Sequence, residues 1–506
     1  MSAFLYFYKF LTLPQPRMYR QVLSASSVSL LLVALLAFRG DNEFVSSFQK
    51  INEDVLKNSR AYETLGNAVS TIGHRLTGSV NGAKAEQYAF NLFKKYGYTD
   101  VKYQPFEVES WMRDTVTLEV VPNKSDNFRS VPVVALAHSP VQARVNGAIV
   151  DVGNGLEEDF EAVKEQIKGN IAMANIGLVN GKPGQKNLHR SEKTALAIQY
   201  GATAIITVNQ VPGNVLLTGT ASVTGSLISI PAVNISKESG EEIRNWIKVD
   251  TDLHAIVDMR NVSKKIKARN IIATLPGKTD ERIIIGGHLD SWDLATGATD
   301  NGLGSFTIMD IARAFKALKL KPKRTIDFVL FMGEEQGLLG SRQVVKELVK
   351  NKQIDKVKFM MNLDMTNNVQ GMNVGGRDEL VPFFQAVGEQ IKKVDANFAN
   401  LVGSRAALHS DHQPFMLEGI PTGAPAGRLA PNVFGCYHAD CDNFNLVNRE
   451  EMTNGVRFSA MLLYALANAD ALPAKKLDSN KTRDLLVAQG LKKELILGKD
   501  WKWNDN

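Results

Sequence analysis

Cysteine is scarce in this chain, and its scarcity excludes one class of fold. Only Cys436 and Cys441 occur among 506 residues, so a disulfide framework cannot replace hydrophobic cores. At this length, with 44% hydrophobic and 22% charged residues, the chain is long enough for two or three domains that each have a core. We therefore expect an ordinary globular protein.

Long apolar runs are also rare. One run of 11 residues, Val28–Phe38, follows Arg17 and Arg20. Its length suits the central region of a signal peptide and falls short of the roughly 20 residues that a membrane-spanning helix needs. We expect residues 1–42 to be a signal peptide, with an uncleaved type II signal anchor as the alternative. The protein would then be secreted, and it would contact a membrane only if the anchor is kept.

Charge of one sign is not in large excess. The chain has 59 Lys and Arg residues against 53 Asp and Glu residues, a net charge of +6. Basic segments such as Lys264–Lys267 are short and lack interleaved aromatic residues. This pattern favours a solvated face, so we expect no nucleic-acid partner.

The order of apolar patterns indicates an outer α/β domain that carries an insertion. Helical spacing before residue 97 is followed by strand-like alternation from Val101 to Val121. Short strands, Gly/Ser/Thr-rich loops and the helix–strand unit Lys193–Val208 then indicate a small inserted α/β domain. The predicted domains are 43–125 and 263–472 for the outer domain, 126–262 for the insertion and 473–506 for a polar C-terminal tail.

From Asn270 onward, buried strands alternate with amphipathic helices. This pattern predicts a mostly parallel central sheet flanked by helices on both faces. Strands are expected at Arg282–Gly286, Thr325–Phe331 and Lys358–Leu363, and helices at Gly302–Leu318, Leu338–Val349, Glu379–Lys393 and Arg449–Asn468.

Side chains with metal-binding chemistry follow the predicted strands. His288 and Asp290 come after the apolar run Ile283–Ile285, and Asp300 precedes a helical pattern. Because the carboxyl ends of strands in such a sheet form a binding crevice, imidazole and carboxylate groups there predict a zinc site. The candidate ligands are His288, Asp300, Asp364, His438 and one of the adjacent pair Glu334 and Glu335.

Five ligands exceed the number in one tetrahedral site, and a carboxylate can bridge two ions. We therefore expect two zinc ions per chain, about 3.5–4 Å apart, that share Asp300 and a water molecule. In extended chain, Asp290 faces the same side as His288, so its carboxylate is expected to accept the other N–H of the imidazole. One of the two glutamates would bind metal, while the other would act as general base on the metal-bound water.

The fragments HLDSWD, DNG, GEEQG, NLD and YHxxxD resemble the M28 family of zinc peptidases. Together with Ile72–Ser79, the first fragment is most similar to the carboxypeptidase Q branch of that family. The resemblance covers about residues 50–470 and includes a protease-associated-like insertion. It implies one zinc ion on His288 and Asp364, another on Glu335 and His438, Asp300 as the bridge, and Glu334 as the base.

The resemblance also implies a secreted or lysosomal homodimer that cleaves dipeptides or short peptides with free termini. However, Asn443 stands where the family often has Thr, and His409–His412 resembles other M28 aminopeptidases. Dipeptidase or carboxypeptidase specificity and aminopeptidase specificity therefore both stay open. A metal-free binding ectodomain and a single-zinc acyltransferase similar to glutaminyl cyclase are further alternatives, which the complete ligand set disfavours.

Several residues near the candidate ligands have open roles. His409 and His412 are either extra ligands or, as we prefer, part of the pocket wall or its support. Cys436 and Cys441 flank His438, and they form a small disulfide loop, remain free thiols or bind metal. Trp292 is a candidate pocket aromatic or a packing residue. The candidates for binding a substrate carboxylate are Arg377, Arg405 and Arg428.

Overall fold

The computed structural model describes residues 41–121, 128–249 and 252–504. The predicted signal segment through Phe38 lies outside these residues. Within the described ranges, no helix combines the length and the apolar character needed to cross a bilayer.

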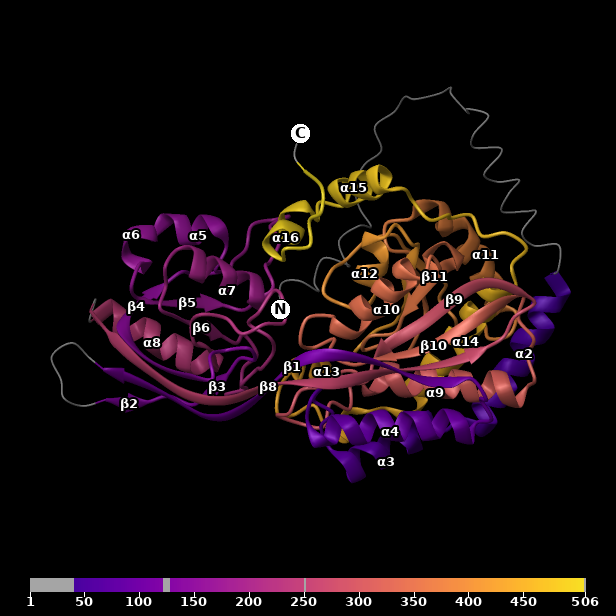
Figure 1. Cartoon of the computed structure of the whole chain (residues 1–506), viewed down its shortest axis with the longest axis horizontal. Helices are drawn as coiled ribbons and strands as arrows, with labels where there is room; N and C mark the ends of the chain where they lie inside the picture. Colours follow the sequence, from indigo (N-terminus) through magenta and orange to yellow (C-terminus); the bar gives the residue numbers. More distant parts are fainter. Residues whose placement is uncertain (1–40, 122–127, 250–251, 505–506) are drawn as a thin grey trace, which may run out of the picture.

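Two long strands connect the outer domain and the insertion. Strands β1 (Val101–Val121) and β8 (His254–Leu275) pair in antiparallel fashion along almost their whole length, and both run through the two regions (Figure 1). The predicted boundary between residues 262 and 263 falls inside β8. Within the described residues, one 14-stranded sheet therefore extends through both regions.

The outer domain contains a mixed sheet whose centre is parallel. The strand order is β13-β12-β14-β11-β9-β10-β8. Strands β10, β9, β11 and β14 run parallel, whereas β8 and β12 are antiparallel to their neighbours β10 and β14. The bounds are β9 Thr279–His288, β10 Arg324–Phe331, β11 Val357–Asn362, β12 Gly371–Asn373, β13 Leu401–Gly403 and β14 Thr422–Ala426. The parallel centre brings the carboxyl ends of β9, β10 and β11 to one edge.

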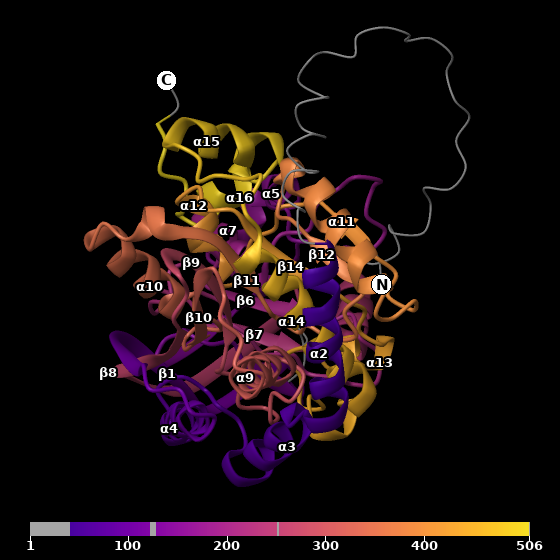
Figure 2. The ribbon, with the colours of Figure 1, turned by 90° about the vertical axis from the view of Figure 1, so that its right-hand side faces the viewer.

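Helices cover both faces of this sheet (Figures 1 and 2). On β9, Ile283 and Ile285 contribute to one core, and Ile284 contributes to the opposite one. The first core contains residues of α2 (Asp41–Asn58), α3 (Ala61–Ile72), α4 (Val80–Lys95), α9 (Gly302–Ala317), α11 (Val381–Lys392) and α14 (Arg449–Asn468). The second contains residues of α10 (Leu339–Lys350) and α12 (His412–Leu417). Burial on both faces explains the nearly continuous apolar sequence of the strands.

The insertion is an α/β unit with its own core. Strands β4 to β7 run parallel, and β3 is antiparallel to β7. The strands are β2 Arg129–Ser130, β3 Val133–Ala135, β4 Gln142–Asp151, β5 Ile171–Asn175, β6 Ala204–Val208 and β7 Ala232–Ile235. The helices are α5 Glu157–Ala162, α6 Lys164–Ile167, α7 Arg190–Gln199 and α8 Lys237–Val249.

The C-terminal tail packs across both regions. Helix α15 (Ser479–Ala488) lies above the outer domain in Figure 1, and α16 (Lys492–Leu497) lies next to the insertion, where it contacts α7. Asp500 binds Arg342 of α10 through two hydrogen bonds of 2.7 Å. The tail thus forms a bridge between the insertion and the outer domain.

Candidate metal centre

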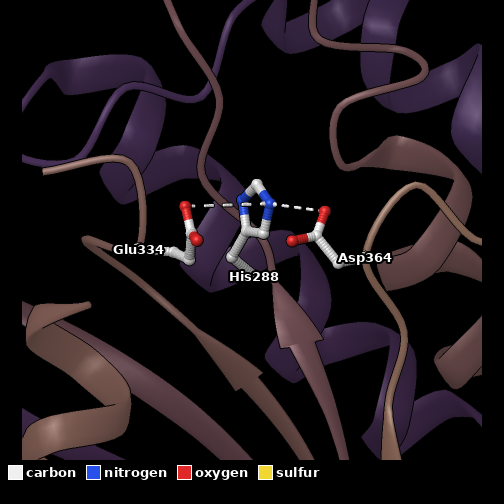
Figure 3. Close-up of side chains that lie close together, drawn as sticks. All are labelled: His288, Glu334 and Asp364. Carbon is white, nitrogen blue, oxygen red and sulfur yellow. Dashed lines mark hydrogen bonds and ion pairs between the residues drawn. The ribbon is translucent and has the colours of Figure 1, made fainter. Parts of the chain in front are cut away.

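One half of the candidate centre surrounds His288, the last residue of β9. Its Nε2 lies 3.3 Å from Asp300 Oδ1 and 3.4 Å from Asp364 Oδ1. Figure 3 shows the ring between the carboxylates of Asp364 and Glu334, whose Oε2 is 4.0 Å from the same nitrogen. Asp364 follows β11, so the ends of adjacent parallel strands supply these groups.

The other half surrounds His438. Its Nε2 lies 3.0 Å from Asp300 Oδ2 and 3.1 Å from Glu335 Oε2. The two oxygens of Asp300 therefore face two different imidazoles. Burial alone would raise the pKa of Asp300, but hydrogen bonds from His288 and His438 outweigh it and hold this pKa well below its usual range. This is the placement that a bridging carboxylate requires.

The buried charges of the site suit cations. His288, Asp300 and Glu335 bring ligand atoms within 4.8 Å of one another, and so do His288, Glu334 and Asp364. Glu335 Oε1 is buried with no hydrogen-bond partner among the described residues. Several carboxylates crowded around two imidazoles away from water are costly unless cations compensate their charge. Mixed nitrogen and oxygen donors of this kind fit zinc.

The adjacent glutamates occupy different surroundings. Glu335 points to His438, whereas Glu334 lies beside His288. Burial raises the pKa of Glu334 well above its usual value, and the charges of Asp364 and Glu335 add to this rise against the opposing effect of His288. A carboxylate with raised proton affinity next to the centre suits a general base.

Asp290 supports His288 differently from the sequence-based expectation. His288 Nδ1 lies 3.1 Å from the backbone carbonyl of Asp290 and 3.7 Å from its carboxylate Oδ1. The hydrogen bond thus goes to the carbonyl, because β9 ends at His288 and the residues after it do not continue as a strand. The carboxylate instead accepts a 3.4 Å hydrogen bond from the backbone N–H of Glu334.

Asp442, the aspartate of the YHxxxD fragment, holds the loop that carries Asp300. Its Oδ1 accepts hydrogen bonds from the N–H and hydroxyl of Thr299, at 2.8 and 2.6 Å. Its Oδ2 accepts one from the N–H of Asp300 at 3.0 Å. Burial raises the pKa of Asp442 to about 6. Its neighbour Asn443 accepts a 3.2 Å hydrogen bond from Thr296 in the same loop.

The early segment Ile72–Ser79 positions two ligand loops at once. The buried guanidinium of Arg75 donates to the carbonyls of Leu289, Thr296 and Gly297 at 2.6 to 2.8 Å. Thr77 Oγ1 accepts a 2.7 Å hydrogen bond from the N–H of Gly333, directly before the two glutamates. The sequence reasoning assigned no role to Arg75 or Thr77, although the resemblance already singled out their segment.

The segment His409–His412 supports the centre through its serine. Ser410 Oγ donates to Asp364 Oδ2 at 2.6 Å and accepts from Asn362 at 2.7 Å. His409 faces Glu192 of the insertion at 3.5 Å, and His412 binds a backbone carbonyl. Neither histidine is in the two ligand groups found within the described residues; His438 is also outside them, but its Nε2 faces Asp300 and Glu335.

Cys436 and Cys441 form a disulfide, so they are neither free thiols nor metal ligands. The bridge closes a short loop around His438, whose φ of +56° lies in the left-handed region that non-glycine residues seldom adopt. A covalent link across this loop restrains His438 in that conformation.

Comparison with known proteins identifies both regions. Residues 270–463 match the model of peptidase family M28, and residues 130–243 match the PA domain. The chain therefore contains a peptidase family M28 domain and a PA domain. The predicted family, the α/β fold with a PA insertion and the assignment as a peptidase are therefore confirmed.

The relatives include peptidases of two specificities. Carboxypeptidase Q of Xenopus laevis is 24% identical over 441 residues, which cover 85% of this chain and 92% of that protein. A probable leucine aminopeptidase 2 of Aspergillus fumigatus is 26% identical, with 79% and 80% covered. An aminopeptidase structure from Aneurinibacillus sp. strain AM-1 has a TM-score of 0.63 at 25% identity, with 85% and 98% covered.

Three parts of the chain line a pocket beside the centre. The PA domain supplies His189–Glu192, the M28 domain supplies Glu334, Glu335 and Tyr437, and the tail supplies Glu494 and Asp500. Sequence reasoning missed Arg190, which this pocket contains. It lies outside the fragments that carry the family resemblance, so no motif marked it.

Of the other candidate pocket residues, His409 also lines this pocket, whereas Trp292 and the three candidate arginines do not. Arg377 is buried in an ion pair with Glu379 at 2.6 Å, and Arg405 and Arg428 are exposed. Trp292 is buried and packs edge-on against the ring of His438, with 6.1 Å between the ring centres. It therefore belongs to the packing that positions His438.

Proposed function

We propose that this M28 peptidase is a di-zinc exopeptidase that hydrolyses dipeptides or short peptides with free termini. The observation that carries the proposal is the position of Asp300, whose two oxygens face His288 and His438. Asp364 and Glu335 would complete the two sites, one on each side of this bridge. A zinc aminopeptidase from Bacillus subtilis shares the fold, with a TM-score of 0.60 at 22% identity.

The residues around the centre have separable tasks. Zinc held here would polarise the scissile carbonyl and lower the pKa of a bound water molecule. Glu334 takes the proton of that water on its carboxylate and passes it to the departing amine. His288 donates its Nδ1 proton to the carbonyl of Asp290, which fixes the tautomer that leaves Nε2 free for metal.

The surroundings of the pocket favour short substrates. Its walls come from α7 of the PA domain, the loop of Glu334, and α16 with the residues that follow it. A chain that extended far on both sides of the scissile bond would have to displace one of these walls. This argument supports exopeptidase action, with aminopeptidase specificity as the second candidate because of the fungal relative.

A peptide panel tests the proposal. Purified protein would be given one dipeptide, its N-acetyl form, its C-terminal amide and an internally quenched decapeptide blocked at both ends. We expect cleavage of the free dipeptide, loss of activity with a chelator and recovery on addition of zinc. Efficient cleavage of the doubly blocked decapeptide would contradict exopeptidase action, and full activity in the chelated, metal-free protein would contradict the zinc mechanism.

We also propose that the protein is exported and acts as a homodimer. The disulfide supports export, because thiols stay reduced in the cytosol of most organisms. N-terminal sequencing of protein from its host should begin near Phe38–Phe44 if the signal is cleaved. Light scattering should give twice the chain mass, and a monomer at working concentration would contradict the dimer.

A further inference from the structure

We infer that a cavity beneath α10, away from the metal centre, binds a free α-amino acid with an apolar side chain, and that its occupancy lowers the turnover of the enzyme. This inference rests on the proposed function, because an exopeptidase releases free amino acids. The cavity encloses about 190 Å³ between α10 and strands β1, β8, β9 and β10. A cavity of about 150 Å³ already holds a ligand of the size of benzene.

The cavity lies apart from the site of hydrolysis. Along β9, its lining residue Ile284 comes four residues before His288, which corresponds to about 13 Å of extended chain. Among the residues that the structure describes, no candidate metal ligand lines it. An amino acid bound beneath α10 would therefore leave the metal centre free for substrate.

The floor of the cavity suits an apolar side chain. Ile272 of β8 pairs with Val329 of β10, and Ile284 of β9 belongs to the same apolar cluster on this face of the sheet. Val344 and Leu348 of α10 cover them from the other side. A ligand side chain placed between these groups is removed from water, which favours binding.

One wall of the cavity carries two opposite charges that do not pair with each other. Lys102 of β1 is exposed, and its ammonium has no partner among the described residues. Glu347 of α10 accepts hydrogen bonds from the amides of Gln104 at 2.6 Å and Gln343 at 2.8 Å. A carboxylate has room for about four donors, so Glu347 can bind a cation as well. Lys102 lies near it, because it is two residues from Gln104 on the same face of β1.

An α-amino acid matches this wall better than other small ligands do. Its ammonium and its carboxylate are attached to one carbon atom, so they can bind Glu347 and Lys102 together while the side chain covers the apolar floor. A simple carboxylic acid would leave Glu347 without a cation, and a simple amine would leave Lys102 without an anion. Arg282 and Asp327 on the opposite wall are already joined by two hydrogen bonds of 2.6 Å, so they do not need a ligand.

A chain of hydrogen bonds connects Glu347 with the loop of Glu334. The N–H of Met332, two residues before Glu334, donates to Asn270 Oδ1 at 3.0 Å. The amide of the buried Asn270 donates in turn to Gln104 Oε1 at 2.9 Å, and the amide of Gln104 donates to Glu347. Every bond donates toward Glu347, so its negative charge polarises and strengthens the whole chain.

This chain gives the direction of the effect on turnover. An ammonium bound to Glu347 would neutralise its charge and weaken the hydrogen bonds that lead to Met332. The loop before Glu334 would then be held less firmly, and the general base would lose part of its fixed position. Misplacement of a catalytic group slows the chemical step. Occupancy should therefore lower kcat and leave KM nearly unchanged.

Calorimetry with L-leucine tests the binding site in zinc-loaded enzyme. Wild type should show a binding event that Lys102→Gln weakens about 10- to 100-fold, as expected for the loss of a charge-assisted hydrogen bond. Leu348→Trp fills the cavity and should abolish this event. Isocaproate, which lacks the ammonium, and isoamylamine, which lacks the carboxylate, should not displace L-leucine. Lys350→Gln, at an exposed lysine of α10 outside the cavity, serves as the matched control.

Turnover at saturating dipeptide tests the coupling, because excess substrate prevents competition at the metal centre. L-leucine should lower kcat several-fold in wild type and in the Lys350→Gln control. In Lys102→Gln, the same concentration should leave kcat at the value measured without L-leucine. Glu347→Gln lacks the charge that polarises the chain, so it should have a reduced kcat without L-leucine and little further response.

The outcomes separate this inference from the proposed function. Equal affinity for L-leucine in wild type, Lys102→Gln and Leu348→Trp would overturn the binding site and leave the peptidase function intact. Binding that depends on Lys102, together with an unchanged kcat, would overturn the control of turnover. Failure of wild type to cleave any peptide in the panel would instead reject the proposed function, and calorimetry would still decide whether the cavity binds an amino acid.

Discussion

At the scale of single residues, residues that are adjacent in sequence contact different parts of the candidate metal centre. Glu334 and Glu335 are adjacent, yet one lies beside His288 and the other beside His438. The fragment GEEQG could indicate that the pair belongs to a metal site, because carboxylates after a buried strand suit metal chemistry. It could not indicate which glutamate faces which histidine, since that depends on the loop fixed by Thr77 and Asp290.

The role of Glu334 can be tested by removing its basicity alone. Glu334→Gln keeps the shape of the side chain but cannot accept a proton from water. We expect kcat to fall by at least about 10²–10⁴-fold, the usual contribution of a general base. Zinc content measured by mass spectrometry should stay at the wild-type value. A variant that keeps its zinc and turns over like wild type would refute the assignment.

A buried histidine away from the metal centre should make the fold less stable in acid. His138 in the PA domain is fully buried, and burial lowers its pKa to about 4. Because the unfolded chain has the higher pKa, near 6.5, it takes up a proton first as pH falls below that value, which destabilises the fold. Well above pH 6.5, His138 is neutral in both the folded and the unfolded chain, so it does not change the free energy of unfolding. By pH 5 the free energy of unfolding has fallen by about 2 kcal/mol.

His138→Asn removes the titrating group and suits the left-handed backbone, which has a φ of 68° at this position. Between pH 7.5 and pH 5, the variant should lose about 2 kcal/mol less unfolding free energy than wild type. Denaturant titrations at the two pH values measure this difference. Equal losses in the two proteins would show that His138 is not held neutral.

At the scale of elements, the ends of parallel strands assemble the centre. The apolar runs of β9, β10 and β11 could be predicted from sequence because they are buried on both faces, and parallel pairing then places their ends together. Sequence patterns gave less information where the structure depends on long-range contacts. The full extent of β8 is an example, because its exposed central residues pair with β1 and have no apolar pattern of their own.

The disulfide loop offers a test at this scale. Cys436→Ser combined with Cys441→Ser should loosen His438 and weaken zinc binding there, while His288 and Asp364 keep their supports. Loss of a supporting interaction typically costs about 10- to 100-fold in metal affinity. Competition with a chromophoric chelator should show one site weakened by that factor and the other unchanged. Two unchanged affinities would show that the loop is held without the bridge.

At the scale of the whole molecule, the pocket depends on regions far apart in sequence. Strands β1 and β8 connect the PA and M28 domains, and the tail bridges them (Figure 1). The inserted domain could be predicted from its change in composition. The position of Arg190 beside His438 and of α16 beside α7 could not, because each depends on how two separately patterned regions pack.

Shortening the tail tests its contribution to the pocket. Deletion of residues 492–506 removes Glu494 and Asp500 from the wall, together with the buried Leu495. We expect KM for dipeptides to rise and zinc content to stay unchanged, because the candidate ligands lie outside the tail. Arg483→Gln, at an exposed tail residue beside Asp484, serves as the control. An unchanged KM in the folded deletion would show that the tail has no part in substrate binding.

The central claim is that Asp300 bridges two zinc ions, and anomalous diffraction tests it most directly. Crystals of active, zinc-loaded enzyme would be measured on both sides of the zinc absorption edge. The account predicts two anomalous peaks about 3.5–4 Å apart, one between His288 and Asp364, the other between His438 and Glu335, and Asp300 in contact with both. A single peak in fully active enzyme, or two peaks that Asp300 does not join, would contradict it.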